Sequence, residues 1–194
     1  RLALRREAIV SDLNTKFIVP GKTLSEISKL LREEDEEAYL VVSQKHIVFR
    51  ISGYYVVSRL LEGDFLDYNA AIPKISKTTV KINTRSLTDS VERTSLLISD
   101  RLRSPIRLVV TENKVQLSCS TAMGKAHDEV DCEVSGEAVS MGFNNKYLLD
   151  ALKASDCDMV KLEINGALSP MRMIPMEGDS FLFLVLPVRV KNDD

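Results

Sequence analysis

The chain has 194 residues, of which 44% are hydrophobic and 28% charged, and a formal net charge of −2. This length exceeds one typical domain of roughly 100 to 150 residues, and the composition is that of a globular protein rather than a disordered or membrane-spanning chain, because no apolar run reaches about 18 residues. The slightly acidic charge excludes a protein that holds nucleic acid by bulk positive charge, so any role on DNA must be local or topological.

A strand and a helix are the first elements that the sequence predicts. Residues 1–10 mix apolar and basic side chains and predict a strand that runs on into 17–19, where Pro20 breaks it. Thr23 and Glu26 then have the spacing of a capping box, and the apolar stripe behind them predicts an amphipathic helix.

An acidic run and a group of strands follow this helix. Five carboxylates at 33–37 oppose the dipole of a helix C-terminus, so the run is predicted to be a solvated loop, with a catalytic carboxylate cluster as the alternative. From residue 39 the apolar period changes to two, which predicts a meander of antiparallel strands at 39–42, 46–51 and 54–61.

The rest of the chain repeats the order of helix and strands. Asn83 or Thr84 can cap a helix over 83–98, and Asn144 with its neighbour opens a second helix. Strands are predicted between and after these helices, at 106–110, 115–120, 126–134, 159–164, 171–176 and 181–190.

Two stretches of the chain echo each other at an offset of 124 residues. Residues 143–155 repeat the polar start, the apolar positions and the basic third turn of 19–31, and such self-similarity indicates copies of one unit. Only eighteen residues precede the first copy, whereas a further helix and several strands precede the second. We therefore predict the rear part of one repeat at 1–75, a boundary near residue 75, and a complete repeat at 76–194.

Five segments carry a resemblance to a known family. In order, RLALR, EGDFLDYNAAIP, VERTSLL, GFNNKYLLDAL and LVLPVRV resemble the bacterial sliding clamps, the beta subunits of DNA polymerase III. The resemblance extends over essentially the whole chain and implies a DNA clamp fold, an α+β class in which each repeated domain packs two helices on antiparallel sheets. Because clamp subunits have three such domains, the chain is expected to hold most of the second and all of the third, with the front portion missing.

The resemblance also implies a function without catalysis. A clamp is a homodimeric ring that encircles duplex DNA without sequence specificity, acts as the processivity factor of the replicative polymerase, and is cytoplasmic and nucleoid-associated in bacteria. Its expected partners are the DNA polymerase III catalytic subunit, the clamp loader and other proteins with a short Gln/Leu/Phe-containing motif, and no membrane, cofactor or metal is implied. The motif-binding pocket carried over from the family consists of Arg1, Leu2, Leu66, Ala70, Ala71, Tyr147, Pro170, Leu184, Val185, Leu186, Pro187, Val188 and Arg189.

The end of the last predicted strand supports a pocket there independently of the family. Pro187 cannot donate to a β-ladder, so the strand should lie at an edge or leave the sheet at this point and expose apolar side chains. The alternative is a core strand over 181–188, and we expect its odd and even positions to divide between core and pocket. Well-known clamps have a proline, an arginine and a larger aliphatic residue at Leu66, Ala70 and Ala71, so the pocket here is predicted to be wider, with a different partner preference.

Two further surfaces follow from the resemblance. The expected DNA-facing cations are the helix residues Lys22, Lys29, Arg85, Arg93, Lys146 and Lys153, which can meet phosphates without reading bases; an ordinary solvated helix face is the alternative. The expected dimer interface includes Leu96, Leu97, Ala126, Asp128 and Val130, the last three on an edge strand that could extend the sheet of a partner subunit.

Two other hypotheses remain open. Cys119, Cys132 and Cys157 are widely spaced beside apolar neighbours, which favours reduced thiols in a cytosolic protein. An enzyme would need a nucleophile or metal with a positioned base, and the two histidines, His46 and His127, lie near no motif of that kind. A peptide-binding scaffold of the same fold that does not act on DNA is the other alternative.

Overall fold

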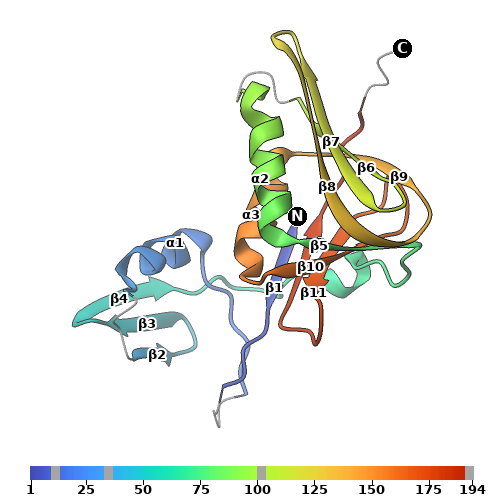
Figure 1. Cartoon of the computed structure of the whole chain (residues 1–194). Coiled ribbons are helices and arrows are strands. Elements are labelled where there is room, and N and C mark those ends of the chain that lie inside the picture. Colours follow the sequence, from blue (N-terminus) through green and yellow to red (C-terminus); the bar gives the residue numbers. More distant parts are fainter. Residues whose placement is uncertain (10–13, 33–36, 100–103, 191–194) are drawn as a thin grey trace. The chain divides into compact units, whose positions relative to one another are not determined.

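The computed structural model describes residues 1–9, 14–32, 37–99 and 104–190 (Figure 1). By its internal contacts the chain forms two compact units: a large unit of Arg1–Ala8 with Tyr68–Asp194, and a small unit of Ile9–Asp67. The repeat boundary near residue 75 stays a prediction. No helix in the described ranges is long and apolar enough to cross a membrane.

The large unit contains the order strand, helix, three strands twice. The first copy consists of β5 (Thr78–Asn83), α2 (Thr84–Thr94), β6 (Ile106–Val110), β7 (Lys114–Thr121) and β8 (Gly124–Gly136). The second consists of β9 (Val139–Phe143), α3 (Asn145–Ser155), β10 (Met159–Ile164), β11 (Met171–Pro175) and β12 (Phe181–Val185). This order matches the two-fold repeat predicted from the sequence.

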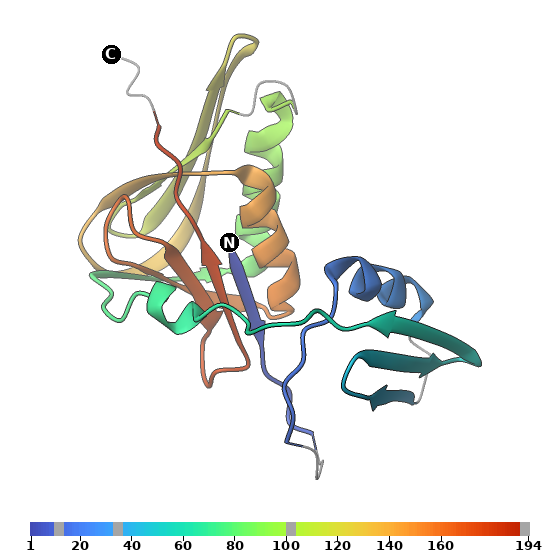
Figure 2. The same cartoon turned by 180° about the vertical axis from the view of Figure 1, so that it is seen from behind.

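The strands of the large unit form one antiparallel sheet in the order β1-β12-β11-β10-β5-β8-β7-β6-β9. The first strand, β1 (Leu2–Arg5), joins this sheet by pairing with β12, and Figure 2 shows it in dark blue beside the red C-terminal strands. The helices α2 and α3 lie side by side against the sheet (Figures 1 and 2). The core between helices and sheet is apolar, with side chains such as Leu87, Val91, Leu148 and Leu152 fully or almost fully buried.

Asparagine side chains begin both helices of the large unit. The Asn83 side chain accepts a hydrogen bond of 2.9 Å from the backbone N–H of Ser86, and Asn144 accepts one of 3.2 Å from Tyr147. Each satisfies a backbone donor that the first turn of a helix leaves without an intrahelical partner. The predicted starts of both helices are therefore confirmed.

The small unit repeats half of the same pattern. Its helix α1 (Gly21–Leu30) is followed by a three-stranded antiparallel sheet of β2 (Ala38–Val42), β3 (His46–Ile51) and β4 (Tyr54–Arg59), which confirms the predicted meander. The buried apolar side chains of this unit are Ile27, Ile47, Phe49, Ile51 and Leu60. Helices α1 and α3 begin at residues that correspond in the sequence echo, so the echo reports a real structural repeat.

Several sequence predictions differ from the structure at the ends of elements. No side chain caps α1, because Pro20 and Gly21 start the helix earlier and the Thr23 hydroxyl instead hydrogen-bonds Ser58 at 2.7 Å; the predicted capping box is wrong. The first strand ends at Arg5. The helix expected over 83–98 ends at Thr94 and is followed by a 3-10 turn, η2 (Ser95–Leu97).

Two further differences concern strands. A five-residue strand that was not predicted from the sequence, β9, lies just before α3. The last strand, predicted to reach residue 190, ends at Val185 because the chain leaves the sheet before Pro187. Most of the acidic run expected to be a loop, 33–36, lies outside the described residues.

Candidate partner-binding site

The segment after β12 leaves apolar side chains at the surface of the large unit. Leu186 and Val188 are 48% and 40% exposed, although they follow directly on a buried strand. The backbone N–H of Val188 donates a hydrogen bond of 2.8 Å to the carbonyl oxygen of Gly142 in β9, so the segment crosses from β12 to the other end of the sheet. We call residues 186–190 the C-terminal segment. Its exposed apolar side chains agree with the expectation drawn from Pro187.

The start of β1 lies against the first turns of α3. The guanidinium carbon of Arg1 is 4.4 Å from the centroid of the Tyr147 ring, a cation–π contact, and an Arg1 nitrogen is 2.5 Å from an Asp150 carboxylate oxygen. Leu2 pairs directly with Leu184 in the β1–β12 ladder. The structure therefore brings together four predicted pocket residues, Arg1, Leu2, Tyr147 and Leu184, from segments far apart in the sequence.

The predicted pocket residues differ in their exposure to solvent. Leu184 and Val185 are only 2% and 1% exposed, so the expected alternation of core and pocket positions is wrong at the end of β12. Ala70 and Ala71 are exposed in the 3-10 turn η1 (Tyr68–Ala71), and half-buried Pro170 directly precedes β11. Leu66, which is 82% exposed, belongs to the small unit.

A cavity of about 360 Å³ adjoins the C-terminal segment. It is lined by Val188 and Arg189, which the sequence analysis named, and also by residues that it missed, among them Arg107, Gly142 and Leu168. Of these residues, only Gly142 could have been found from the sequence, because a glycine within an apolar strand often marks a place where another backbone segment packs closely. Arg107 and Leu168 carry no such signal because their position depends on sheet order.

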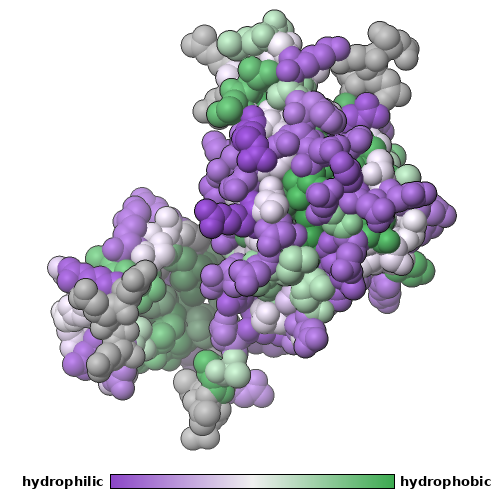
Figure 3. Space-filling view, viewed as in Figure 1, coloured by the Kyte–Doolittle hydropathy of each residue, from purple (hydrophilic) through white to green (hydrophobic). Residues whose placement is uncertain are grey.

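The six cations expected to face DNA lie on α1, α2 and α3, and at least three of them form ion pairs with described residues. Lys29 pairs with Glu26 at 2.8 Å, Arg93 with Asp128 at 2.8 Å and Lys153 with Glu92 at 2.7 Å. Lys22, Arg85 and Lys146 are also exposed on their helices. The surface over α2 and α3 is mostly hydrophilic in the view of Figure 3. Such a face suits weak contacts with phosphates, which stays a prediction.

The first half of β8 is an edge within the described sheet. Residues 124–131 pair with β7 on one side, whereas β5 pairs only with 132–136. Val130 belongs to the apolar core and Ala126 is half-buried, so mainly the backbone of this edge is free to extend another sheet. Of the two predicted interface leucines, Leu96 is 83% exposed, while Leu97 is half-buried beside Gly124.

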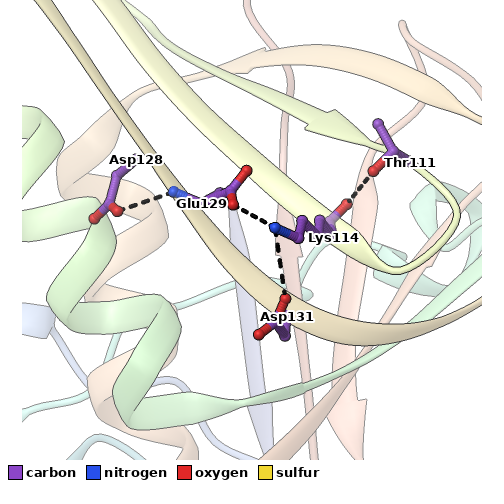
Figure 4. Close-up of polar contacts among 5 residues, drawn as sticks. All are labelled: Thr111, Lys114, Asp128, Glu129 and Asp131. Atoms are coloured by element: carbon purple, nitrogen blue, oxygen red, sulfur yellow. Dashed lines mark hydrogen bonds and ion pairs between the residues drawn. The ribbon is translucent and has the colours of Figure 1, made fainter.

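Charged side chains on β8 point to both faces of the sheet. Figure 4 shows the Asp128 carboxylate on the side of α2, while Glu129 and Asp131 hold Lys114 of β7. Burial alone would raise the pKa of Asp128, but the Ser90 hydroxyl, the Arg93 guanidinium and the Glu129 backbone N–H together lower it. The Ser90 hydroxyl is not within hydrogen-bonding geometry of Asp128, so we attribute the lowered pKa of Asp128 chiefly to Arg93 and Glu129.

Two of the three thiols, those of Cys119 and Cys132, are unsuited to nucleophilic chemistry. Burial raises the pKa of Cys119 and of Cys132, which disfavours the reactive thiolate, and the Cys119 thiol donates to the Thr94 carbonyl oxygen at 3.0 Å. All three cysteines are free. Within the described residues, no group of three or more His, Cys, Asp or Glu side chains could hold a metal ion.

Repeated strand–helix–strand units, paired helices on an antiparallel sheet and an exposed segment beside the last strand define the DNA clamp fold. Comparison with known proteins agrees: residues 69–189 match the DNA polymerase III beta subunit, C-terminal domain, and residues 1–67 match its central domain. The chain belongs to the DNA polymerase III beta subunit family.

Individual relatives show the same relationship. The beta sliding clamps of Staphylococcus epidermidis (strain RP62A) and Staphylococcus aureus (strain Mu50) are each 33% identical to this chain, over 97% of its residues and 51% of theirs. The chain therefore spans about half the length of these relatives.

Solved structures agree with these relatives. A putative DNA polymerase III beta subunit from Eubacterium rectale and the sliding clamp from Bacillus subtilis both give a TM-score of 0.90, at 31% and 29% identity. The aligned regions cover 96% and 97% of this chain and 51% of the length of each solved chain. The sliding clamp of Bartonella birtlesii, bound to griselimycin, gives 0.81 at 27% identity, over 90% of this chain and 47% of that one.

Proposed function

We propose that this chain is part of a DNA sliding clamp, the processivity factor of a replicative DNA polymerase. The full protein would form a homodimeric ring around duplex DNA and tether the polymerase, the clamp loader and repair proteins without catalysing a reaction itself. Curated relatives named as beta sliding clamps support this proposal. A ring that encloses DNA needs little affinity for it, which reconciles the role with a net charge of −2.

The observation that carries the proposal is the exposed apolar surface of the C-terminal segment. Leu186 and Val188 remain accessible beyond the buried end of β12, and Tyr147, itself 40% exposed, lies on the first turn of α3. Apolar anchors that bury roughly 300 Å² would supply about 7 kcal/mol, and association costs reduce this figure, so the Kd should be no tighter than the micromolar range. Contacts of this strength exchange quickly, as a site shared by successive partners requires.

Fluorescence anisotropy of a labelled peptide containing Gln, Leu and Phe tests this site. The chain should bind the peptide saturably with a Kd near micromolar, and Leu186→Asp and Tyr147→Ala should each weaken binding at least tenfold. Met123→Asp is the matched control, because Met123 is 76% exposed on the same unit but belongs to no predicted site. If the folded chain does not bind, or if all three variants bind equally well, the proposed site is wrong.

A scaffold that binds peptides but does not act on DNA is the second candidate, and one observation favours it. At least three of the six predicted DNA-facing cations, Lys29, Arg93 and Lys153, already have carboxylate partners among the described residues. Retention of the full-length protein on DNA distinguishes the two candidates. A clamp loaded by its loader should stay on circular DNA and slide off short linear DNA, whereas the scaffold would be retained on neither.

A further inference from the structure

Gly142 marks the place where the C-terminal segment touches β9. The Val188 N–H donates to the Gly142 carbonyl oxygen at 2.8 Å, and the two residues form an isolated antiparallel bridge. A Cβ atom at Gly142 would lie 2.6 Å from the Val188 carbonyl oxygen and 2.3 Å from a Val190 methyl carbon. Real Cβ atoms essentially never approach other heavy atoms this closely, so any side chain at this position would displace the segment.

The requirement at Gly142 is space rather than backbone freedom. Its φ lies outside the left-handed range that disfavours other residues, unlike the φ of Gly136 at the end of β8. The contact at 2.6 Å is with backbone, which cannot swing aside as the end of a side chain can. A methyl group here would therefore act on the path of the segment and leave the local fold of β9 intact.

The segment has little else to hold its backbone. β12 ends at Val185, and within the described residues the Val188–Gly142 bridge is the one backbone pairing that residues 186–190 make to a strand. Gly142 also lines the cavity of about 360 Å³ together with Val188, Arg189 and Leu168. The same residue thus fixes the position of the segment and helps to form the space beside it.

We propose that Gly142 is a positioning residue for the partner-peptide site: its bare Cα lets the segment dock on β9, which holds Leu186 and Val188 where a peptide can contact them. This inference rests on the proposed function, because it assigns a role within the same site. Gly142 itself does not contact the peptide.

The test compares Gly142→Ala with Gly21→Ala, a matched control at a glycine with open space around its Cα and no left-handed φ. Gly142→Ala should raise the Kd for the Gln/Leu/Phe peptide at least tenfold, while Gly21→Ala should not change it. Amide hydrogen exchange should become faster at Val188 and stay unchanged at Phe183, which lies inside the β12 ladder. Adding Val190→Ala relieves only the side-chain contact, so it should restore part of the binding.

The outcomes separate the two proposals. If the unaltered chain does not bind the peptide, the proposed function fails and the positioning role fails with it. If the unaltered chain binds and Gly142→Ala binds equally well, only the positioning role is wrong. Faster exchange at Phe183 as well as Val188 would show that Gly142 serves the folding of the whole unit, and this too would overturn the positioning role.

Discussion

Arg93 of α2 and Asp128 of β8 form an ion pair in which two guanidinium nitrogens lie 2.8 and 2.9 Å from the same carboxylate oxygen. The family resemblance assigns Arg93 to the DNA-facing surface and Asp128 to the subunit interface. One contact therefore joins two surfaces that the proposed clamp would use for different partners. Asp128 is also the better shielded member, with 26% of its side chain exposed against 61% for Arg93.

The stability that this pair contributes should depend on pH. The pKa of Asp128 is lowered in the folded chain, so its contribution is present above the unfolded pKa of about 3.9 and is lost as the pH falls through the folded value. We expect Asp128→Asn to cost about 0.5–1 kcal/mol at neutral pH. The difference from the unaltered chain should shrink towards zero as the pH falls through the folded pKa of Asp128.

Urea unfolding of the large unit, followed by its methyl NMR signals at several pH values, measures this effect. Asp131→Asn is the matched control on the same strand, because Asp131 is 90% exposed and lies 4.0 Å from Lys114. It should change the free energy of unfolding by less than about 0.5 kcal/mol. A loss for Asp128→Asn that is independent of pH would contradict the electrostatic explanation.

Asn144 and Asn145 stand next to each other but should differ in their effect on stability. The Asn144 side chain accepts a hydrogen bond from the Tyr147 backbone N–H, whereas Asn145 is the first residue inside α3. Asn144→Ala should therefore destabilise the large unit by about 1 kcal/mol, while Asn145→Ala should be nearly neutral because alanine suits a helix. Thermal unfolding of both variants checks this, and equal losses would show that the cap contributes nothing.

The two units have separate apolar cores of very different size. Among the described residues, the buried cluster of the small unit contains five, including fully buried Ile47, whereas Leu148 belongs to a much larger cluster in the large unit. Ile47→Ala should cost about 2–5 kcal/mol, enough to unfold a marginal small core. We expect amide protection to disappear from β3 while β10 stays protected. Loss of protection in both strands would mean that the units unfold together.

Local patterns explain which parts of the fold could be predicted from the sequence. The alternation in β3 and the asparagine before α3 are properties of neighbouring residues, and both were interpreted correctly. The start of α1 was predicted wrongly, because the Thr23 side chain hydrogen-bonds Ser58 of β4 rather than the backbone of its own helix. Short β9 was missed because its burial depends on β6, which lies far away in the sequence.

In the candidate site, too, features set by neighbouring residues could be predicted from the sequence, whereas contacts between distant segments could not. Pro187 predicts that the last strand stops pairing near this residue, and β12 ends two residues before it, at Val185. Nothing near Lys153 in the sequence indicates that Glu92, on another helix, neutralises it at 2.7 Å. The sequence therefore identifies the cations that could face DNA, but it does not show that Lys153 is ion-paired, because this pair forms only where α2 packs against α3.

This pairing leads to a prediction about DNA. Because Glu92 holds Lys153, Glu92→Gln should free the ammonium group and remove a repelling carboxylate. In the proposed full-length clamp this change should strengthen contact with duplex DNA. The slope of log K against log salt concentration should become steeper by about 0.9 for each added phosphate contact. Glu112→Gln in the exposed β6–β7 turn makes the same change in net charge away from the helices. Binding measured over a salt series should change for Glu92→Gln alone, and an equal change in both variants would assign the effect to net charge and remove Lys153 from the proposed DNA surface.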